Sequence, residues 1–552
     1  MVPKLKIIPL GGIGEIGKNM TVVEFGNDMI IIDAGMGFPD ESMYGIDLVL
    51  QDISYLKTNR DRIRGLILTH GHEDHIGGVS YLLREINIPI YTTALTAALV
   101  ELKLEELDLL YNTQIFTKKA GSEFRLGCFN IKFIHVNHSI PDAVALAIDT
   151  PIGTIVHTGD FKIDTTPYVD ETTDLAEFGR LGEKGVLCLM SDSTNTEKPG
   201  YSDSELKVGD SFDKLFNGCR ERIIITTFAS NVHRLQQIIN VAEKYGRKVA
   251  VTGRSMENIL KVCSVLGYMQ LKENVVVSLD AVKKLPKDKT VIISTGSQGE
   301  SMSALYRMAF GGHKLLQIQQ GDRVIISASA IPGNELMITR VIDELFRKGA
   351  DVIYDKNTDL HVSGHAQQGE QKLILGLVKP KFFIPVHGEY RMLVKHARLA
   401  ETMGVNPNNI VIADNGDVIE ITKKNIRKAD SVSAGDVLVD GSSVGEIGSV
   451  VLRDRHRLAE DGMVVVVIPF STYDKTIVGN PEIVTRGFIY VKDSERLIND
   501  LKRISCEAVE SCTGDELRDI NAIKMKVKKN ISDYLYNSSK SNPMVLPVIV
   551  EL

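Results

Sequence analysis

The sequence contains no tryptophan and only six cysteines in 552 residues. The cysteines are scattered and form no Cys-x-x-Cys pair, which argues against a disulfide framework and against a cysteine-rich zinc site. Disulfide-stabilised proteins belong to oxidising compartments. We therefore expect a protein of a reducing, cytoplasmic compartment.

Long apolar runs are missing as well. A membrane-spanning helix needs about 20 consecutive apolar residues, and the longest obvious run, Met463 to Phe470, is far shorter. Lys4 and Lys6 interrupt the only apolar stretch near the N-terminus, so no signal peptide and no membrane partner are expected. The length is sufficient for three or four domains, each with its own core.

Basic charge is in short supply, because 64 Lys and Arg face 71 Asp and Glu, a net charge of −7. A nucleic-acid binder needs cations against phosphate, so the acidic residues must lie away from such a channel or form part of a metal site. Bound metal ions would reverse the local charge there. Several basic residues do lie near the motifs described below: Lys18, Lys162, Arg234, Arg254, Arg307 and Arg391.

The most informative segment is His70-Gly71-His72-Glu73-Asp74-His75, which follows the apolar run Leu66–Thr69. Histidine is scarce here (13 in the whole chain), yet three histidines fall within these six positions. The apolar run predicts a buried strand, so the potential ligands lie on the loop that leaves it. Imidazole suits zinc, and carboxylate oxygen extends the choice to manganese or iron. The segment predicts a metal site, with enough ligands to begin two.

Further candidate ligands follow other apolar runs. Asp33 ends the run Met29–Ile32, His138 follows Ile134–Asn137, Asp160 follows Thr154–Gly159, and His387 follows Phe382–Val386. Each predicted strand thus presents a polar residue at its end, which is how a rigid sheet places ligands on loops. We expect these residues to join the histidine cluster.

Two other motifs are misleading. Gly12, Gly14 and Gly17 fit the dinucleotide fingerprint Gly-x-Gly-x-x-Gly, which requires a helix after it. Strand patterns follow instead, so these glycines are predicted to form a hairpin loop. Ser297 lacks the Gly-x-Ser-x-Gly spacing of a hydrolase nucleophile, and a strand-to-helix turn there suits anion contact better.

The pattern of the chain predicts several domains. Residues 1–205 are rich in strand patterns, whereas 206–355 alternate helical and strand patterns and predict a parallel α/β layer. Residues 356–422 return to the first domain with His361, His365 and His387. A polar segment, 423–449, is interpreted as a linker. The tail, 450–552, carries strand patterns at Met463–Ile468, Thr485–Val491 and Met544–Val550 and helical patterns at Asp493–Ser511 and Asp515–Asn537.

These motifs, in this order, resemble those of the metallo-β-lactamase superfamily. The long interval between Asp160 and His387 requires an inserted domain, and Ser191–Thr194, His361–Ala366 and Pro385–Glu389 resemble the β-CASP nucleases. Within that group the chain resembles the bacterial ribonuclease J family, through the segments Gly11–Asn19, Thr227–Arg234 and Ser294–Glu300. The resemblance implies an α/β fold: an αββα metallo-β-lactamase sandwich, an inserted β-CASP α/β domain and a small C-terminal α/β domain.

The resemblance also implies a site. His70, His72 and His138 would hold one divalent metal ion, Asp74, His75 and His387 a second, and Asp160 would bridge them. Zinc is the expected metal and manganese the alternative. Asp33 would orient a ligand histidine. A metal-activated water would attack phosphorus, and His365, oriented by Asp192, would protonate the leaving 3′-oxygen. Products would carry 5′-phosphate and 3′-hydroxyl ends.

The family's activity would be 5′→3′ exonucleolytic and endonucleolytic cleavage of RNA, in ribosomal RNA maturation and messenger RNA decay. A pocket for a 5′-monophosphate is expected from Ser230, Asn231, His233, His361, Ser363, Gly364 and His365. For Ser230 and Asn231 the alternative is simple capping of the following helix.

The resemblance further implies partners: a homodimer or homotetramer formed through the tail, a paralogous partner chain, and RNA-decay proteins. Two alternative functions remain open. One is a DNA-processing β-CASP nuclease, which His387 disfavours because the RNA-acting members keep histidine there. The other is a small-molecule metallo-hydrolase, which the inserted domain disfavours.

Overall fold

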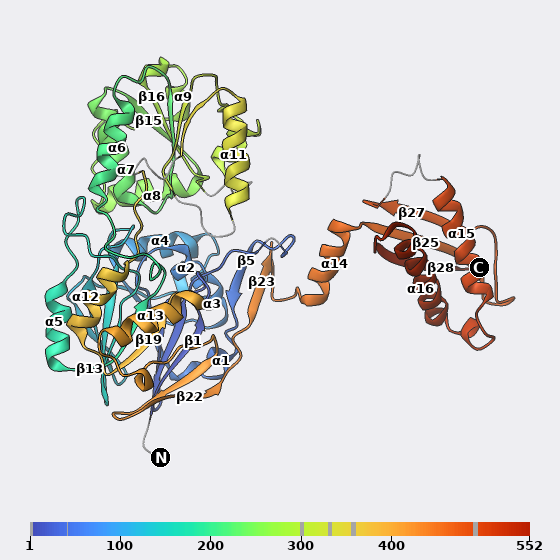
Figure 1. The fold of residues 1–552 in the computed structure, drawn as a ribbon, viewed down its shortest axis with the longest axis horizontal. Coiled ribbons are helices and arrows are strands. Elements are labelled where there is room, and N and C mark those ends of the chain that lie inside the picture. Colours follow the sequence, from blue (N-terminus) through green and yellow to red (C-terminus); the bar gives the residue numbers. More distant parts are fainter. Residues whose placement is uncertain (1–3, 41, 298–302, 329–333, 355–359, 489–494) are drawn as a thin grey trace. The chain divides into compact units, whose positions relative to one another are not determined.

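A computed structural model describes residues 4–40, 42–297, 303–328, 334–354, 360–488 and 495–552. It divides the chain into two compact units (Figure 1). Unit 1 comprises residues 1–38 and 49–437, and unit 2 comprises residues 39–48 and 438–552. Three predicted segments extend outside the described residues. These are Ser294–Glu300 at positions 298–300, Thr485–Val491 at positions 489–491 and Asp493–Ser511 at positions 493–494. No helix among the described residues is long and apolar enough to cross a membrane.

Two sheets form the base of unit 1. The larger has eight strands, in the order β22 (Ile426–Ser431), β21 (Asp417–Ile421), β1 (Leu5–Gly11), β3 (Met20–Phe25), β4 (Asp28–Ile32), β6 (Ile63–Ile67), β7 (Ile90–Thr92) and β8 (Ile115–Thr117). The smaller has six, in the order β19 (Phe382–Val386), β13 (Val186–Asp192), β12 (Gly153–His157), β11 (Val144–Thr150), β10 (Phe129–His135) and β9 (Glu123–Leu126).

The sheets face each other across one apolar core. Side chains such as Ile7 and Ile30 of the larger sheet pack in the same cluster as Phe133 and Met190 of the smaller one. Helices cover the outer faces. On the larger sheet these are α3 (Val79–Glu85) and α4 (Ala94–Glu105); on the smaller sheet they are α5 (Leu175–Lys184), α12 (Gln368–Val378) and α13 (Tyr390–Thr402). The predicted αββα sandwich is confirmed.

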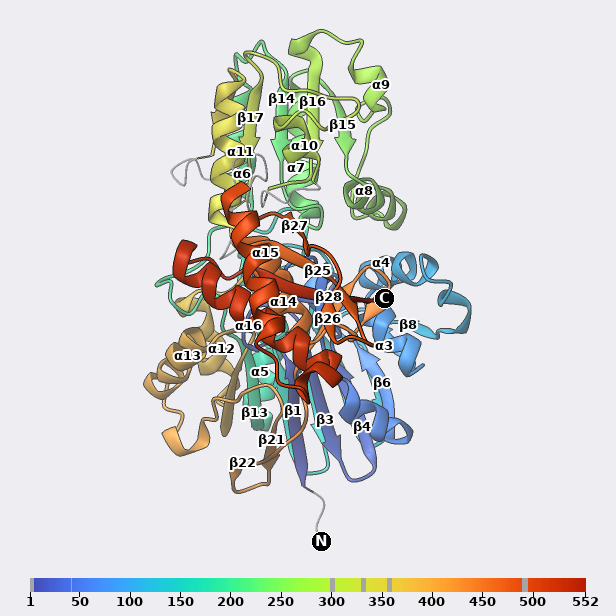
Figure 2. The same ribbon diagram turned by 90° about the vertical axis from the view of Figure 1, so that its right-hand side faces the viewer.

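The inserted part of unit 1 is a parallel sheet with helices on both faces (Figure 2). Its strand order is β15 (Lys248–Thr252), β16 (Thr290–Ser294), β14 (Ile223–Thr226), β17 (Arg323–Ile326) and β18 (Asp351–Ile353). One face packs on α6 (Leu206–Phe216), α7 (Val232–Lys244) and α8 (Arg254–Leu266); the other packs on α10 (Ala304–Ala309) and α11 (Glu335–Arg347). The continuous apolar strands follow from this two-sided burial. The predicted parallel α/β layer is confirmed.

The interpretation of 423–449 as a linker is wrong in its first part. β22 pairs with β21 at the edge of the eight-stranded sheet, and β23 (Asp436–Asp440) pairs with β24 (Ser443–Val444). Only the first residue of β22, Ile426, is buried. An edge strand is held by its backbone hydrogen bonds to a single neighbour, so polar side chains do not prevent it from forming.

The glycine-rich loop is a hairpin, as predicted. It connects β1 to β3, which pair antiparallel. Within it β2 (Ile13–Gly14) pairs with β20 (Gly388–Glu389), so the loop also contacts the segment that carries His387. The nucleotide-binding interpretation of these glycines is therefore not supported by the local fold.

Unit 2 is a small α/β sandwich. β25 (Met463–Ser471) is its central strand and pairs with β26 (Thr476–Ile477), β27 (Glu482–Arg486) and β28 (Met544–Glu551). Helices α15 (Glu495–Glu510) and α16 (Ile520–Ser539) pack on one face of the sheet. The strand predicted at 485–491 lies earlier, at Glu482–Arg486, because Gly487 ends it with φ of 67°.

Candidate metal centre and active site

Three imidazoles converge where strands of the two sheets end. His70 and His72 lie on the loop after β6, and His138 lies on the loop after β10. The Nδ1 atom of His72 is 3.1 Å from Nε2 of His70 and 3.1 Å from Nε2 of His138. Three ring nitrogens directed at one point are a donor set that suits zinc and similar divalent ions.

A second group of donors lies beside the first. It consists of Asp74, His75, Asp160 and His387, whose ligand atoms lie within 4.8 Å of one another. His387 Nε2 is 3.1 Å from Asp74 Oδ2, and His75 Nε2 is 3.2 Å from Asp160 Oδ2. β19 carries His387 to the group after the chain has passed through the inserted domain.

Asp160, a member of the second group, also lies near the first. Its Oδ2 atom is 3.8 Å from Nε2 of His70 and 3.5 Å from Nε2 of His387. The same oxygen is buried and has no hydrogen-bond partner among the described residues. Such an oxygen needs a cation beside it, which is either protonated His75 and His387 or a metal ion that replaces their protons. This oxygen and the surrounding nitrogens fit metal binding, and the two groups provide donors for two ions.

Asp33 orients one of the candidate ligands. Its Oδ2 is 2.8 Å from Nδ1 of His75, and its Oδ1 accepts a hydrogen bond of 2.8 Å from the backbone N–H of Thr69. Asp33 has a φ of 60° and His387 a φ of 52°, a region that non-glycine residues rarely adopt. Such conformations collect at functional sites, where the surrounding fold enforces them.

Sequence reasoning assigned no role to Asn19. Its Nδ2 donates to the backbone carbonyl of Asp74, and its backbone N–H donates to that same carbonyl oxygen. Asn19 therefore holds the ligand loop from the glycine-rich hairpin. Its position at the end of the segment Gly11–Asn19 was the only available signal.

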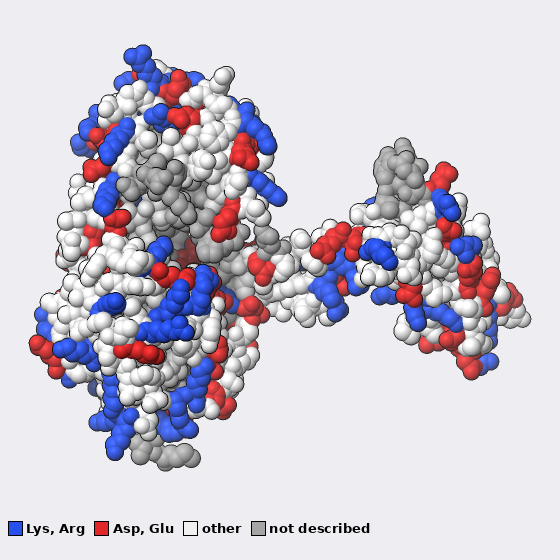
Figure 3. Space-filling view, in the orientation of Figure 1, with Lys and Arg blue, Asp and Glu red and all other residues white. Residues whose placement is uncertain are grey.

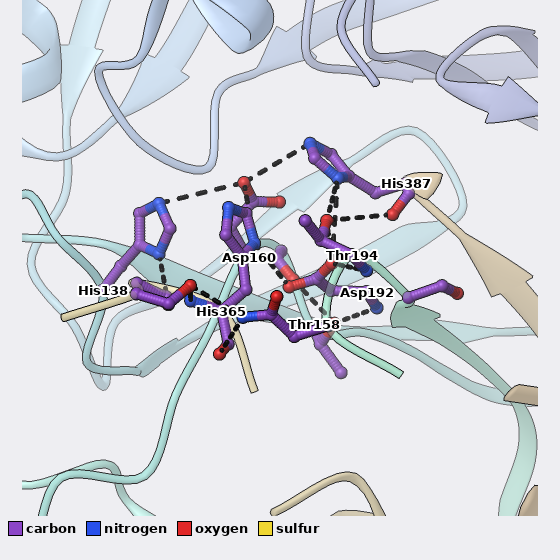
Figure 4. Close-up of polar contacts among 12 residues, drawn as sticks. His138, Thr158, Asp160, Asp192, Thr194, His365 and His387 are labelled. Atoms are coloured by element: carbon purple, nitrogen blue, oxygen red, sulfur yellow. Dashed lines mark hydrogen bonds and ion pairs between the residues drawn. The ribbon is translucent and has the colours of Figure 1, made fainter. Parts of the chain in front are cut away.

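His365 and Asp192 lie together at the edge of the metal groups (Figure 4). His365 Nδ1 is 2.8 Å from Asp192 Oδ2. The side chain of His365 is 21 % exposed and that of Asp74 27 %, whereas those of His387 and His138 are nearly inaccessible. His365, like His72, is therefore a partly exposed imidazole that a substrate can reach.

Thr194 connects Asp192 to His387, a link that sequence reasoning missed. Its hydroxyl lies 2.8 Å from Asp192 Oδ1 and 2.7 Å from His387 Nδ1 (Figure 4). A hydroxyl can donate to the carboxylate and accept from the imidazole at the same time. This arrangement places the proton of neutral His387 on Nδ1 and leaves Nε2 free as a metal ligand.

The two donor groups differ in protonation. Burial lowers the pKa of His70 and His138 well below the usual value and that of His72 to about 4. Burial also opposes charge on His387, but the carboxylates of Asp160 and Asp74 outweigh it and raise its pKa to about 9. The pKa of His75 is raised for the same reason. Without metal, the first group is thus neutral at pH 7 and the second carries protons.

The predicted phosphate pocket is only partly assembled around His365. Asn195 Nδ2 and the backbone N–H of His365 both donate to Ser363 Oγ, which leaves the hydroxyl proton of Ser363 free to donate. The carbonyl of Gly364 lies 2.7 Å from His138 Nδ1. A Cβ on Gly364 would lie 2.7 Å from His138 Cε1, so only glycine fits there.

The residues expected from the inserted domain have other contacts. Asn231 caps α7 by accepting from the backbone N–H of Arg234, which is the capping alternative considered above. His233 Nε2 lies 3.6 Å from Asp170 Oδ2. The backbone carbonyl of Ser230 accepts from Val232 N–H, and among the described residues no side-chain contact places Ser230 at the ligands.

Most of the basic residues near the motifs have acidic or carbonyl partners. Arg234 is fully buried and forms two hydrogen bonds to Glu205, and Lys162 lies 3.1 Å from Asp164 Oδ2. On the face drawn in Figure 3, basic side chains gather over the region of α13. There Arg391 and Lys395 both pair with Glu197. This pairing agrees with the absence of a large positive net charge.

The sandwich fold, the His/Asp donor groups at its strand ends and the inserted parallel α/β domain define a metallo-β-lactamase hydrolase of the β-CASP type. Family models match at residues 13–197 (metallo-beta-lactamase superfamily), 220–345 (ribonuclease J, beta-CASP domain), 351–412 (Zn-dependent metallo-hydrolase RNA specificity domain) and 450–552 (ribonuclease J C-terminal domain).

Full-length relatives narrow the class. The chain is 42 % identical to ribonuclease J2 of Bacillus subtilis over 99 % of both chains. It is 43 % identical to ribonuclease J 1 of Streptococcus pyogenes over 99 % of this chain and 97 % of that protein. It is 44 % identical to ribonuclease J of Synechocystis over 98 % and 86 %. The chain belongs to the ribonuclease J family and is an enzyme of the metal-dependent ribonuclease class, which confirms the resemblance.

A solved structure shows the same fold at greater distance. It is a protein of unknown function from Enterococcus faecalis, 18 % identical, with a TM-score of 0.54 over 76 % of this chain and 100 % of that one. At this identity the likeness concerns the fold alone.

The two donor groups should differ in how pH affects metal binding. Stripped protein is expected to take up two divalent ions per chain. Uptake at Asp74, His75 and His387 must displace protons while the pH is below the raised pKa of about 9 of His387, so that affinity should increase from pH 6 to pH 8. Affinity at His70, His72 and His138 should stay nearly constant, because these rings are already neutral. Calorimetric titration in buffers of different ionisation enthalpy measures both the ions and the protons.

Two variants assign the ions. His387→Ala should remove the pH-dependent ion and His72→Ala the other. Saturation at one ion per chain, or two ions with the same pH dependence, would contradict this assignment.

Proposed function

We propose that the chain hydrolyses RNA phosphodiesters, both 5′→3′ exonucleolytically and endonucleolytically, in ribosomal RNA maturation and messenger RNA decay. The observation that carries the proposal is the position of the His365–Asp192 pair. A partly exposed imidazole, bound to a buried carboxylate at 2.8 Å, lies 3.8 Å from Asp160, whose Oδ2 is also 3.8 Å from His70 and 3.5 Å from His387. His365 could therefore deliver a proton to the same phosphodiester bond whose phosphate is polarised beside Asp160.

Two divalent ions would be held by the groups described above, with zinc the proposed metal and manganese the alternative. When bound, they supply Lewis acidity toward a phosphoryl oxygen and toward a water molecule. All other steps depend on residues of the chain. Asp33 fixes the orientation of His75, and Thr194 that of His387, each by a contact with Nδ1 of the histidine.

His365 is proposed to protonate the leaving 3′-oxygen. Burial disfavours its charged form, but the charge of Asp192 and its hydrogen bond, with the charge of Asp160, raise the pKa of His365 above the usual 6.5. The raised pKa favours the protonated ring, which carries a proton on each nitrogen. Nδ1–H donates to Asp192, and Nε2–H remains available for the leaving group. Products with 5′-phosphate and 3′-hydroxyl ends follow, because the 2′-hydroxyl is not consumed.

A 5′-monophosphate site is proposed next to this proton donor. Burial, with the positive charges of Arg234, Lys198 and Lys162, lowers the pKa of His361 to about 3. Arg234 Nη1 lies 3.3 Å from His361 Nδ1, so this imidazole lies beside basic groups, as an anion site requires. The free proton of the Ser363 hydroxyl adds a directed donor. Of the residues first considered, His361 and Ser363 have the strongest support.

The cellular compartment and RNA-decay partners are also proposed. The six cysteines, all within the described residues, are free thiols. Six free thiols in one chain fit a reducing cytoplasm. A paralogous partner chain and RNA-decay proteins remain proposals from family membership. No observation among the described residues favours the DNA-processing or small-molecule alternatives.

Self-association through unit 2 is proposed from a partly exposed apolar face of its sheet. On the face opposite α15 and α16, Val465 pairs with Leu546 and Val467 with Val548. Leu546 is 47 %, Val548 37 % and Val550 41 % exposed. Helix α14 (Ser449–Glu460) has no buried residue, although helices of this length are marginal without packing. An apolar surface of this kind marks an interaction site.

The rim of this face is self-complementary. Glu482 and Arg486 flank Val484 on β27, and the register places all three beside Val467, Val465 and Met463 of the face. If two copies stack their sheets about a two-fold axis through Val484, Glu482 of each copy lies opposite Arg486 of the other. A second copy of the chain is therefore the proposed occupant.

Removal of His365 should separate chemistry from binding. His365→Ala is expected to slow RNA cleavage by roughly 10² to 10⁴ while RNA affinity and metal content stay close to wild type. In the wild type, kcat should fall as the pH rises through the raised pKa of His365, because the protonated form is the acid. Asp74→Asn is the control, since it should abolish cleavage through the metals. Wild-type rates for His365→Ala would disprove the assigned role.

End preference tests the phosphate site. Exonucleolytic digestion should favour a 5′-monophosphate over a 5′-triphosphate or 5′-hydroxyl, because the site closes on one phosphate. Ser363→Ala should reduce this preference more than it reduces internal cleavage. The same two rates are measured for Ser230→Ala, which also removes one serine hydroxyl. Equal rates on all three ends, measured on one RNA with different 5′ groups, would remove the site from the proposal.

Self-association can be tested in two ways. Val548→Asp should lower the mass found by light scattering and leave both metals bound, because unit 2 contains none of the ligands. A chain ending at Gly445 should do the same and lose activity mainly through weaker RNA binding. As a control, Glu482→Arg and Arg486→Glu should each weaken association, and the double exchange should restore it. Unchanged mass in all of these would place the contact in unit 1.

A further inference from the structure

A buried histidine outside the proposed mechanism lies behind the active site. His396, on α13, is fully buried, and its ring packs edge-on against Phe383 with centroids 4.9 Å apart. Its Nδ1 is 3.0 Å from Ser193 Oγ, while Nε2 has no hydrogen-bond partner within the described part of the chain. Buried polar groups are almost always paired, so a lone buried imidazole with one bond requires an explanation.

The tautomer of His396 follows from this geometry. If Nε2 carried the proton, a buried N–H would be left without an acceptor. If Nδ1 carries it, Nδ1–H donates to Ser193 Oγ, and only a lone pair is unpaired, which is the less costly choice. The hydroxyl of Ser193 can then donate to the carbonyl of Ser191, 3.3 Å away. His396 and Ser193 thus form a directed chain that ends on the backbone of β13.

Ser193 is the middle residue of a tight turn. Asp192 Oδ1 accepts from the backbone N–H of Thr194 at 2.9 Å, which closes the turn around Ser193. The residue on one side, Asp192, holds His365. The residue on the other side, Thr194, holds His387. One turn therefore orients both the proposed proton donor and a candidate metal ligand. His396 is hydrogen-bonded to Ser193, the middle residue of this turn.

The same hydrogen bond connects the segment after His387 back to the turn that holds His387. α13 begins three residues after His387, and His396 returns from that helix to Ser193. The backbone N–H of Ser193 donates to the carbonyl of His387 at 3.3 Å. We propose that His396 is a positioning residue of the active site, which fixes the turn of Asp192 and Thr194 through Ser193. This inference rests on the function proposed above.

Variants at both ends of the bond test this role. His396→Leu removes the donor and keeps an apolar side chain in place, and Ser193→Ala removes the acceptor. Each should lower kcat for RNA cleavage about tenfold or more, with little change in KM, as found for residues that orient ligands indirectly. His396→Asn retains a side-chain N–H near the position of Nδ1 and should restore most of the rate. The double variant should lose no more than either single one.

Two further measurements separate positioning from a general loss of stability. In His396→Leu the alkaline limb of the pH profile of kcat should move to lower pH. The reason is that a less firmly positioned Asp192 stabilises protonated His365 less well. Affinity for the pH-dependent metal ion, titrated into stripped protein, should fall with it. Leu399→Ala is the control: this residue is also buried on α13, and it should lower the unfolding temperature without moving either readout.

The inference is overturned if His396→Leu keeps the wild-type kcat, pH limb and metal affinity, or if it changes them no more than Leu399→Ala does. Failure of His396→Asn to restore the rate in a folded protein would also overturn it. A wild-type chain that does not cleave RNA would instead remove the proposed function, and the metal titration would still report whether His396 holds the turn.

Discussion

The burial of the Asp160 carboxylate is the constraint on which the rest of this site depends. A negative charge in a low-dielectric environment is tolerated only where positive charge or directed donors surround it. Here imidazoles converge on the carboxylate from the loops of both sheets, and one of its oxygens has no hydrogen-bond partner among the described residues. Strand ends from distant parts of the chain must therefore meet at one point, and the apolar core between the sheets keeps that point fixed.

Support for the ligands comes from a second set of polar contacts. Asp33 holds His75, Thr194 holds His387, and the carbonyl of Gly364 holds His138. Each contact uses Nδ1, which leaves Nε2 directed at the centre. The donor set is thus prepared before any ion binds, so that little reorganisation is needed when one arrives.

Much of this could be predicted from the sequence, because the relevant signals are local. The histidine cluster follows an apolar run, and Asp33, His138, Asp160 and His387 each follow another. Thr194 and Asn19 were missed because their partners are far away in sequence: Thr194 meets His387 across 193 positions, and Asn19 meets Asp74 across 55. β22 was missed for a different reason. Its backbone completes a sheet edge, while its polar side chains give the pattern of a linker.

The return of the chain through β19 has a consequence for biosynthesis. His70, His72 and His138 have all left the ribosome long before His387, which is made only after the whole inserted domain. At about 5–20 residues per second, this delay is on the order of tens of seconds. During that time β13 lacks its outer neighbour β19 and presents an open edge. A nascent chain would hold one complete donor group and a second group that still lacks His387, which would keep the nuclease inactive until the chain has been made beyond that residue.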